Sequence, residues 1–395
     1  MKRFSAVRPG IVTAICFVMA ILAWGTVFYG HSVYMDALMR AHGWSSSLIS
    51  SAVLVFWLAS LPGTLSVGVL VDRYGPPVVV AIGGLCIGGG LLGLAWLNQP
   101  WHLFAIYAAM GFGYPALAGA AISATLAPWY DRGFGVALGI ALTGASVGGA
   151  LIPAFTIQYA AVHGFDAAMI TVASALLATS SFAVVGLTIL GRPKGATGED
   201  RLGEPFAMRS VLSRADFWRI SIAAAFGLGG QVGFLAHQVP IIAVEIGQVA
   251  AALMVTVVAI ASAVGRLAVG LMSRYLTVTV LAALSYILYG VGIALLAIAD
   301  NLATIAIACA VAGFVVGAIV MLPPILVREA FGTKGYGRTY AMVNVIMYVF
   351  AGLSPWLVGL IRDWTGAYSP ALWMLVGLEV VAAFLILAGR PRPKG

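Results

Sequence analysis

The sequence predicts an all-α membrane protein whose twelve transmembrane helices form two pseudo-symmetric halves of six helices each. Of its 395 residues, 62% are hydrophobic and only 9% are charged, whereas soluble proteins carry about 25% charged residues. Apolar stretches of the ~20 residues needed to cross a bilayer recur along nearly the whole chain. We expect membrane spans at residues 11–38, 45–71, 78–97, 101–127, 134–160, 166–190, 216–243, 247–272, 278–299, 302–328, 337–361 and 369–388.

An internal repeat supports the division into halves. The longest polar segment, 191–215, separates six spans from six, so we expect an N-terminal half at 1–190, a cytoplasmic linker at 191–215 and a C-terminal half at 216–395. A constant offset of 202 residues aligns glycines and prolines of the two halves without a gap, which is typical of parallel structural repeats. The matched pairs are Gly25/Gly227, Gly63/Gly265, Gly68/Gly270, Gly111/Gly313, Gly133/Gly335, Gly135/Gly337, Pro153/Pro355 and Gly164/Gly366.

The positive charge is distributed by membrane side. With the N-terminus in the cytoplasm, 18 of the 21 Lys and Arg residues fall on the cytoplasmic side, while Arg40 and Arg362 fall outside. This bias predicts that both termini are cytoplasmic. It also accounts for the net charge of +8 without a nucleic-acid partner. The absence of any Asn-x-Ser/Thr site is consistent with a bacterial inner membrane.

No catalytic or cofactor chemistry is visible in the sequence. Cys16, Cys86 and Cys309 all lie within apolar spans and lack the spacing of a disulfide framework or a metal site. No phosphate-binding loop or nucleophile motif occurs. We therefore expect no enzyme, no cofactor and no metal, and the partners we expect are a solute, protons and the lipid bilayer.

The most informative charge is Arg266, in the apolar run 249–272 that contains no acidic residue. A guanidinium stays protonated at any ordinary pH, and placing it at membrane depth costs roughly 3 kcal/mol on insertion scales. We expect Arg266 to face a wet cavity and hold an anionic substrate. The alternative is that its side chain extends to the cytoplasmic surface, because Met272 ends the run only six residues later.

Polar groups in other spans are candidates for orienting that substrate. Arg266 has Thr64 as its counterpart in the repeat, so the fixed charge belongs to the second half only. Asn344 lies six residues from Arg338, as Arg266 does from Met272, which puts both roughly 9 Å inside the cytoplasmic end. The candidate substrate-binding residues besides Arg266 are Tyr34, Tyr114, Gln231, Tyr340, Asn344 and Tyr348.

Three titratable residues within the spans are candidates for proton coupling. His31 lies in the first span, and histidine is the side chain that changes charge near neutral pH. The alternative for His31 is a hydrogen-bonded packing residue. Glu379, in the last span, and His237, in the seventh, are further candidates.

Loop motifs indicate conformational gating. Gly68, Asp72, Arg73 and Gly75 fit the pattern Gly-x-x-x-Asp-Arg-x-Gly between spans 2 and 3. Gly75 suits a tight turn and Gly68 a close helix approach. Asp131 and Arg132 form a similar pair after span 4, and we expect all four charged residues to act in gating. Span 5 then carries Gly139, Gly144, Gly148 and Gly149, which favour close helix packing.

With these motifs the chain resembles the major facilitator superfamily. It is more closely similar to the monocarboxylate transporter and oxalate/formate antiporter group. The segments that carry the closer resemblance are Gly265-Arg266 with Gly270, residues 129–133 leading into 139–144, and residues 359–366.

The resemblance implies specific roles. The span-8 arginine of this group binds the substrate carboxylate, which implies that role for Arg266. Animal members use a span-1 lysine in proton coupling, and His31 stands at that position. The acid one turn before their arginine is Ser262 here. The oxalate exchanger has a span-11 lysine for a second carboxylate, whereas residues 340–360 contain no lysine or arginine, which favours monoanions.

The hypothesis from the sequence is a secondary active transporter that moves small monocarboxylates such as lactate or pyruvate by alternating access, coupled to protons. Two alternatives stay open. One is an exchanger or exporter of other organic anions or drugs, which a wide aromatic cavity without strong proton coupling would suit. The other is a non-transporting membrane sensor, which the lack of an added cytoplasmic domain disfavours.

Overall fold

The chain crosses the membrane twelve times. The structure, a computed structural model, describes residues 2–130, 134–191, 208–273, 275–332 and 336–389, and no strand occurs within these ranges. In the same ranges, twelve helices are long and apolar enough to span a bilayer, which confirms the predicted number. The spans are Arg8–His42, Ser46–Tyr74, Pro76–Ala95, Pro100–Trp129, Val136–His163, Phe165–Leu190, Ala215–Ile246, Gln248–Met272, Val278–Ala297, Leu302–Phe331, Arg338–Thr365 and Ser369–Leu387.

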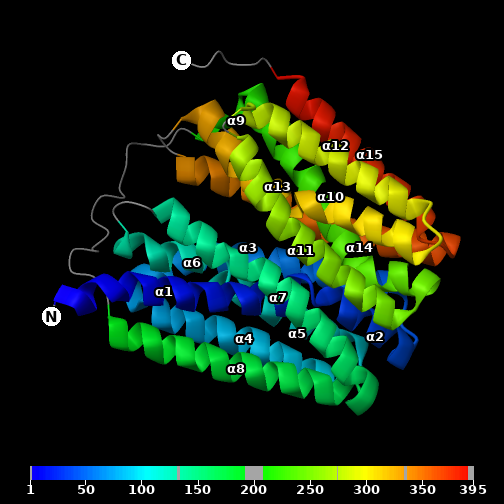
Figure 1. Ribbon diagram of the computed structural model, residues 1–395, viewed down its shortest axis with the longest axis horizontal. Coiled ribbons are helices and arrows are strands. Elements are labelled where there is room, and N and C mark those ends of the chain that lie inside the picture. The colour runs from blue at the N-terminus through cyan, green and yellow to red at the C-terminus, as the bar shows by residue number, and fades with distance from the viewer. Residues whose placement is uncertain (1, 131–133, 192–207, 274, 333–335, 390–395) are drawn as a thin grey trace. The chain divides into compact units, whose positions relative to one another are not determined.

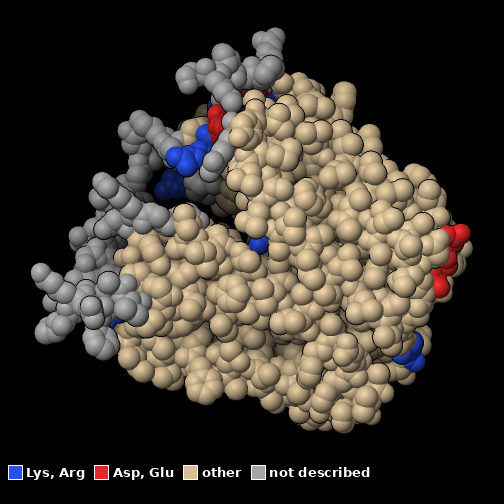
Figure 2. Space-filling view, in the orientation of Figure 1, with Lys and Arg blue, Asp and Glu red and all other residues tan. Residues whose placement is uncertain are grey.

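The outer surface of these helices is mostly apolar, as contact with lipid requires. Large apolar side chains such as Leu65, Phe182 and Leu267 are exposed to the surroundings. The face shown in Figure 2 carries charged side chains only in small groups and is otherwise uncharged. Such an apolar belt would aggregate in water and is stable in hydrocarbon.

The helices divide into two compact units, which are described separately. The first unit contains residues 1–41 and 55–199, and the second contains residues 42–54 and 200–395. The boundary at residue 199 falls within the segment 191–215 that the sequence predicts as a linker. The second unit also includes the first part of the second span.

The first unit is an assembly of six spans in which long helices pack in pairs (Figure 1). Helix α1 packs along α7, and α4 packs between α5 and α8. The elements that involve this unit are α1 (Lys2–Ala23), η1 (Trp24–Phe28), α2 (His31–His42), α3 (Ser46–Tyr74), α4 (Pro76–Ala95), α5 (Pro100–Gly113), η2 (Tyr114–Ala116), α6 (Gly119–Leu126), η3 (Ala127–Trp129), α7 (Phe134–His163) and α8 (Phe165–Leu190).

Glycines in α7 allow it to approach α1 closely. A Cβ on Gly144 would lie against the carbonyl of Phe17, and one on Gly148 against the carbonyl of Ile21. Two glycines four residues apart thus open one face of α7 to the α1 backbone. The close packing predicted for span 5 is confirmed at these positions, whereas no described atom lies within 4 Å of a Cβ on Gly139.

The first and fourth spans are interrupted, which the sequence analysis did not predict for the first. Residues Trp24–Phe28 form a π-helical turn in which the Tyr29 amide donates to the Trp24 carbonyl at 2.9 Å. The fourth span changes to a 3₁₀ turn at Tyr114–Ala116, where Pro115 cannot continue the α-helical hydrogen-bond pattern. Such interruptions inside membrane spans are frequent at functional sites.

The second unit repeats the pairing of the first. Helix α10 packs along α14 as α1 does along α7, and α12 packs between α13 and α15 as α4 does between α5 and α8 (Figure 1). Helix α11 packs along α13. Its helices are α9 (Met208–Leu212), α10 (Ala215–Ile246), α11 (Gln248–Met272), α12 (Val278–Ala297), α13 (Leu302–Phe331), α14 (Tyr336–Thr365) and α15 (Ser369–Leu387).

Glycines that match at the 202-residue offset occupy equivalent contacts. A Cβ on Gly63 would meet the backbone of Phe112, and a Cβ on Gly265 would meet the backbone of Phe314. Phe112 and Phe314 are themselves 202 residues apart. The two units therefore contain the same helix crossing, built from equivalent residues.

The glycines of the partner helices at this crossing also make equivalent contacts in the two units. A Cβ on Gly111 would meet the backbone of Phe56, and a Cβ on Gly313 that of Val258, again at the same offset. No side chain larger than hydrogen fits between these helices without displacing one of them. The offset found in the sequence thus corresponds to a repeated packing arrangement.

Of the two glycine roles predicted near the turn between α3 and α4, the structure supports the tight turn at Gly75 and not the close helix approach at Gly68. Gly75 has φ 93°, a conformation that glycine adopts readily, and it precedes α4. The expectation that Gly68 allows close helix approach is wrong for this structure, because no described atom lies within 4 Å of a Cβ placed there. Gly68 lies instead on an open face of α3.

The start of α3 is held by the end of α14. The carboxylate of Asp363 accepts hydrogen bonds from the backbone amides of Ser46 at 3.2 Å and Ser47 at 2.8 Å. These amides have no partner within α3, and a carboxylate at a helix N-terminus is favoured by the helix dipole. Gly359 on α14 lies against Ser50 in the same contact. The contact accounts for the grouping of residues 42–54 with the second unit.

Candidate functional site

Arg266 lies at the crossing of α11 and α13. Gly265 brings the α11 backbone against Phe314, and the Nε atom of Arg266 lies 2.8 Å from the position that a Cβ on Gly317 would occupy. Gly317 therefore makes the room in which the guanidinium lies. The side chain of Arg266 is half-buried, within a helix that contains no acidic residue. Ser262, one turn earlier, is fully buried.

Helix α14 presents three of the predicted residues in a row. Tyr340, Asn344 and Tyr348 are spaced by four residues and are half-buried. This spacing places them on one side of the helix. The row provides two phenol groups and one amide, which can donate and accept hydrogen bonds.

Gln231 is inside the second unit. Its side chain is fully buried on α10, and neither of its amide atoms has a hydrogen-bond partner in the described part of the chain. Its backbone carbonyl accepts from the Tyr289 hydroxyl at 3.5 Å. Gln231 is thus a buried polar group of α10 in this structure, and substrate contact by its side chain stays a prediction.

Tyr114 belongs to an aromatic cluster of the first unit. The cluster forms where the interrupted fourth span meets the π turn of the first span: the Tyr114 ring lies 5.9 Å from Trp24 in an edge-to-face contact. It also lies 5.4 Å from Phe56 and 6.2 Å from Trp57. Such aromatic pairs stabilise one another by about 1 kcal/mol each. Sequence analysis found Tyr114 but not its partners, because they are brought together by packing.

Tyr34 has a structural contact in the first unit. Its hydroxyl donates to the backbone carbonyl of Thr26 at 2.6 Å, and the side chain is fully buried. Thr26 lies inside the π turn. Tyr34 therefore supports the interrupted part of the first span, and a direct role in substrate binding stays a prediction.

His31 is enclosed by aromatic rings. Its imidazole stacks on Tyr107 at 5.2 Å and contacts Phe56 edge-on at 5.0 Å. The side chain is buried, and neither ring nitrogen has a hydrogen-bond partner among the residues the structure describes. Phe56 contacts both His31 and Tyr114, so the titratable residue adjoins the aromatic cluster.

His237 and Glu379 are buried in the second unit. The Nδ1 atom of His237 lies 3.2 Å from the Gly233 carbonyl one turn earlier on α10, and its ring lies 5.9 Å from Tyr368. Glu379, on α15, lies against Gly230 of α10. Neither side chain is exposed.

Two of the four predicted gating residues can be located. Asp72 and Arg73 are exposed at the end of α3, and the Arg73 guanidinium lies 5.2 Å from the centre of the Tyr74 ring. Asp131 and Arg132 lie outside the described residues. Within the described ranges, no group of three His, Cys, Asp or Glu side chains could hold a metal ion.

Comparison with known proteins decides the family. Residues 13–355 match the Major Facilitator Superfamily. The chain belongs to this superfamily. Its members are transporters and not enzymes, so the chain is a multi-pass membrane transporter protein.

Within the superfamily, the chain is similar to proteins named monocarboxylate transporter 13. Rat monocarboxylate transporter 13 is 28% identical over 362 residues, covering 86% of this chain and 78% of the relative. The bovine protein of the same name is 28% identical over 351 residues, covering 86% and 79%. An uncharacterized MFS-type transporter of Bacillus subtilis strain 168, YcxA, is 32% identical over 107 residues, covering 27% and 26%.

Solved structures share the fold. The nucleoside transporter NupG, as a point mutant, superimposes with a TM-score of 0.77 at 14% identity over 95% of this chain and 99% of that chain. A bacterial homologue of the human lysosomal transporter Spinster, in an inward-facing and unoccupied conformation, gives 0.69 at 15% identity over 98% and 97%. At these identities the likeness establishes the fold alone.

Filling the space at Gly317 tests whether Arg266 lies against this glycine. We expect Gly317→Ala to lower the initial transport rate roughly tenfold, because the added methyl group displaces Arg266 and overpacking costs about 1–3 kcal/mol. The matched control is Gly270→Ala on α11, where no described atom lies within 4 Å of the new methyl group. Equal transport rates in the two variants, at equal protein levels in the membrane, would contradict the placement of Arg266 against Gly317.

Proposed function

We propose that this protein is a secondary active transporter of small monocarboxylates, coupled to protons and working by alternating access. The observation that carries the proposal is Arg266, a permanent cation at an apolar helix crossing, seated in the space left by a glycine. A charge in this position is costly unless it has a function. Because a guanidinium pairs with a carboxylate through two parallel hydrogen bonds, Arg266 is suited to hold the substrate.

Other predicted residues would complete the site. On α14, Tyr340, Asn344 and Tyr348 supply hydrogen-bonding groups from one side of a helix. Gln231, Tyr114 and Tyr34 are proposed to orient the substrate during the transport cycle. Asp72, Arg73, Asp131 and Arg132 are proposed to act in gating, outside the binding step. The similarity to proteins named monocarboxylate transporter 13 supports the substrate class.

Energetics favour coupling to a proton. Moving one anion into a compartment of negative potential costs about 2.3 kcal/mol per 100 mV, so accumulation needs a cotransported cation or an exchanged anion. Arg266 cannot release a proton. We propose His31 as the main relay, with Glu379 and His237 as the further positions. We also propose that both termini are cytoplasmic, from the charge bias of the loops. We propose a bacterial inner membrane as the location, with which the absence of Asn-x-Ser/Thr sites is consistent.

The first test concerns Arg266. We expect Arg266→Lys to reduce carboxylate uptake about tenfold or more, because lysine keeps the charge but loses one of two charge-assisted hydrogen bonds. Uptake in proteoliposomes, with protein level and thermal unfolding as controls, measures the effect. Normal uptake by well-folded Arg266→Lys would support the alternative in which Arg266 reaches the membrane surface.

The second test concerns the number of charges on the substrate. With one arginine and no second cation on α14 between residues 340 and 360, a dicarboxylate would leave one carboxylate unpaired, at a cost of several kcal/mol. We expect lactate and pyruvate to compete for uptake and oxalate and malonate to compete weakly. Stronger competition by oxalate than by lactate would refute the monoanion assignment. A larger organic anion or drug that outcompetes all of these acids would favour the exporter alternative.

The third test concerns His31. We expect His31→Gln to abolish most uptake driven by a pH gradient, while exchange of internal for external substrate continues. Glutamine retains hydrogen-bonding groups but does not titrate. Wild-type uptake that ignores an imposed pH gradient would show exchange instead, and would leave His31 as a packing residue.

A further inference from the structure

A row of buried polar side chains follows the interface between α10 and α15 in the second unit. We define this polar row as Tyr368, His237, Ser354, Glu379 and Tyr286. The ring of His237 lies 5.9 Å from Tyr368, the residue that precedes α15. Ser354, on α14, lies against Gly233 of α10, one turn from His237. The row therefore begins at the N-terminal start of α15 and continues along α10.

The inner end of the polar row is formed by three helices. Glu379 of α15 lies against Gly230 of α10, and its Cβ is 3.4 Å from the position of a Cβ on Gly290 of α12. Tyr286 of α12 lies against Gly227 of α10. Glycines thus create the space for the Glu379 and Tyr286 side chains.

The polar row contains hydrogen-bonding atoms that the protein leaves without partners. His237 Nε2, Ser354 Oγ, both Glu379 oxygens and the Tyr286 hydroxyl are buried and have no hydrogen-bond partner among the described residues. Buried polar groups in proteins are almost always paired with protein or with ordered water. A concentration of such atoms along one interface therefore indicates a place that water and protons can occupy.

The surroundings of Glu379 favour its neutral form. The titratable groups along the row are His237 on α10, Tyr286 and Tyr289 on α12, and Tyr368 before α15. The charged residues beside it, Arg362 over the Tyr368 ring and Asp363 near His237, lie at the Tyr368 end of the row. In the described part of the chain, no hydrogen bond joins Arg362 to Glu379. Helix α14 contributes Ser354 at this depth. An ionised carboxylate buried away from bulk water needs a cation or several donors. Glu379 can meet this need by binding a proton.

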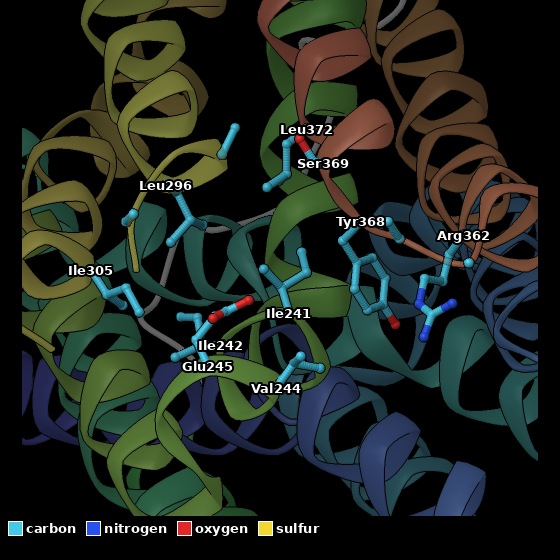
Figure 3. Close-up of a pocket in the computed structure, with 14 residues that line it drawn as sticks. Ile241, Ile242, Val244, Glu245, Leu296, Ile305, Arg362, Tyr368, Ser369 and Leu372 are labelled. Atoms are coloured by element: carbon cyan, nitrogen blue, oxygen red, sulfur yellow. The ribbon is translucent and has the colours of Figure 1, made fainter. Parts of the chain in front are cut away.

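A pocket connects the other end of the polar row with the surface. It has a volume of about 220 Å³ and lies between the ends of α10, α12, α13 and α15, with Tyr368 and Arg362 in its wall. Figure 3 shows the Arg362 guanidinium beside the Tyr368 ring, and the carboxylate of Glu245 on the opposite side of the pocket. Because one acid and one guanidinium line the pocket, its charges cancel. The arrival of a proton is not opposed by a net positive charge.

The distances suit transfer through water. His237 and Gly230 are seven residues apart on α10, which corresponds to roughly 10 Å along the helix axis. Ser354 lies between these positions, at Gly233. One or two bridging waters are therefore enough to connect the imidazole with the Glu379 carboxyl group.

We infer that Glu379 is a proton-binding site, loaded from the pocket through Tyr368, His237 and Ser354. The O–H bond of the neutral acid forms as the N–H or O–H bond of the donating neighbour breaks, so each transfer along the row balances. In symport the bound proton leaves toward the other side of the membrane. This inference rests on the proposed function, because it assigns the second unit a coupling site of its own, separate from Arg266. His31 serves the first unit.

Two variants test the site against matched controls. Glu379→Gln mimics the neutral acid and fits the same space, so the protein folds. We expect it to lose at least 90% of the uptake driven by a pH gradient, about a tenfold reduction, and to retain exchange. His237→Gln slows proton-driven uptake several-fold and leaves exchange intact. The controls are Asp166→Asn and His163→Gln, both at exposed positions of the first unit, which behave as wild type.

An infrared measurement tests proton binding without any transport. At neutral pH the wild-type protein shows the carbonyl band of a protonated carboxylic acid, and Glu379→Gln lacks it while Asp166→Asn retains it. Absence of the band from the wild type overturns the inference. So does undiminished proton-driven uptake by Glu379→Gln.

Two further outcomes separate this inference from the proposed function. Uptake that follows a sodium gradient instead of a pH gradient, and is lost in Glu379→Gln, makes the site a metal-ion site and overturns the proton assignment. If wild-type liposomes take up and exchange no carboxylate, the proposed substrate class fails. In that case the infrared band alone supports or overturns proton binding by Glu379.

Discussion

The close crossing of α11 and α13 determines where the permanent charge of this transporter lies. Gly265 and Gly313 remove the side chains that would hold the two helices apart, and the backbones meet at Phe314 and Val258. Arg266 follows Gly265 directly, so its position is fixed by this tight contact of the second unit. A guanidinium that must be desolvated in a membrane gains from such a rigid support, because less of its conformational freedom is lost on binding an anion.

The first unit contains the same crossing without the charge. Gly63 and Gly111 form the equivalent contact, but Thr64 stands in the place of Arg266 and donates to the Ser60 carbonyl in its own helix at 2.8 Å. One scaffold thus carries two kinds of chemistry. The first unit carries the aromatic rings around Tyr114, and the second carries the charged Arg266. Internal repetition preserved the packing positions, while the positions next to them diverged.

The sequence predicted what depends on composition and spacing. Twelve spans followed from hydropathy, and the repeat followed from glycines whose contacts are now seen to match at Gly63 and Gly265. It did not reveal the aromatic partners of Tyr114 or the space at Gly317, because both arise where distant segments meet. It also assigned Gly68 a packing role that the structure does not support, since a motif shows that glycine is present but not which face of the helix is covered.

The π turn at Trp24–Phe28 has a consequence for the phase of the first span. A π turn holds one residue more than an α turn, and each residue rotates a helix by about 100°. The side chains of α2 are therefore rotated relative to a straight continuation of α1. Because His31 is the first residue of α2, this rotation affects the direction in which its side chain meets Phe56 and Tyr107. A single-residue deletion within the turn would restore the regular phase, and would direct His31 toward different neighbours without changing any residue of the aromatic cluster outside the turn.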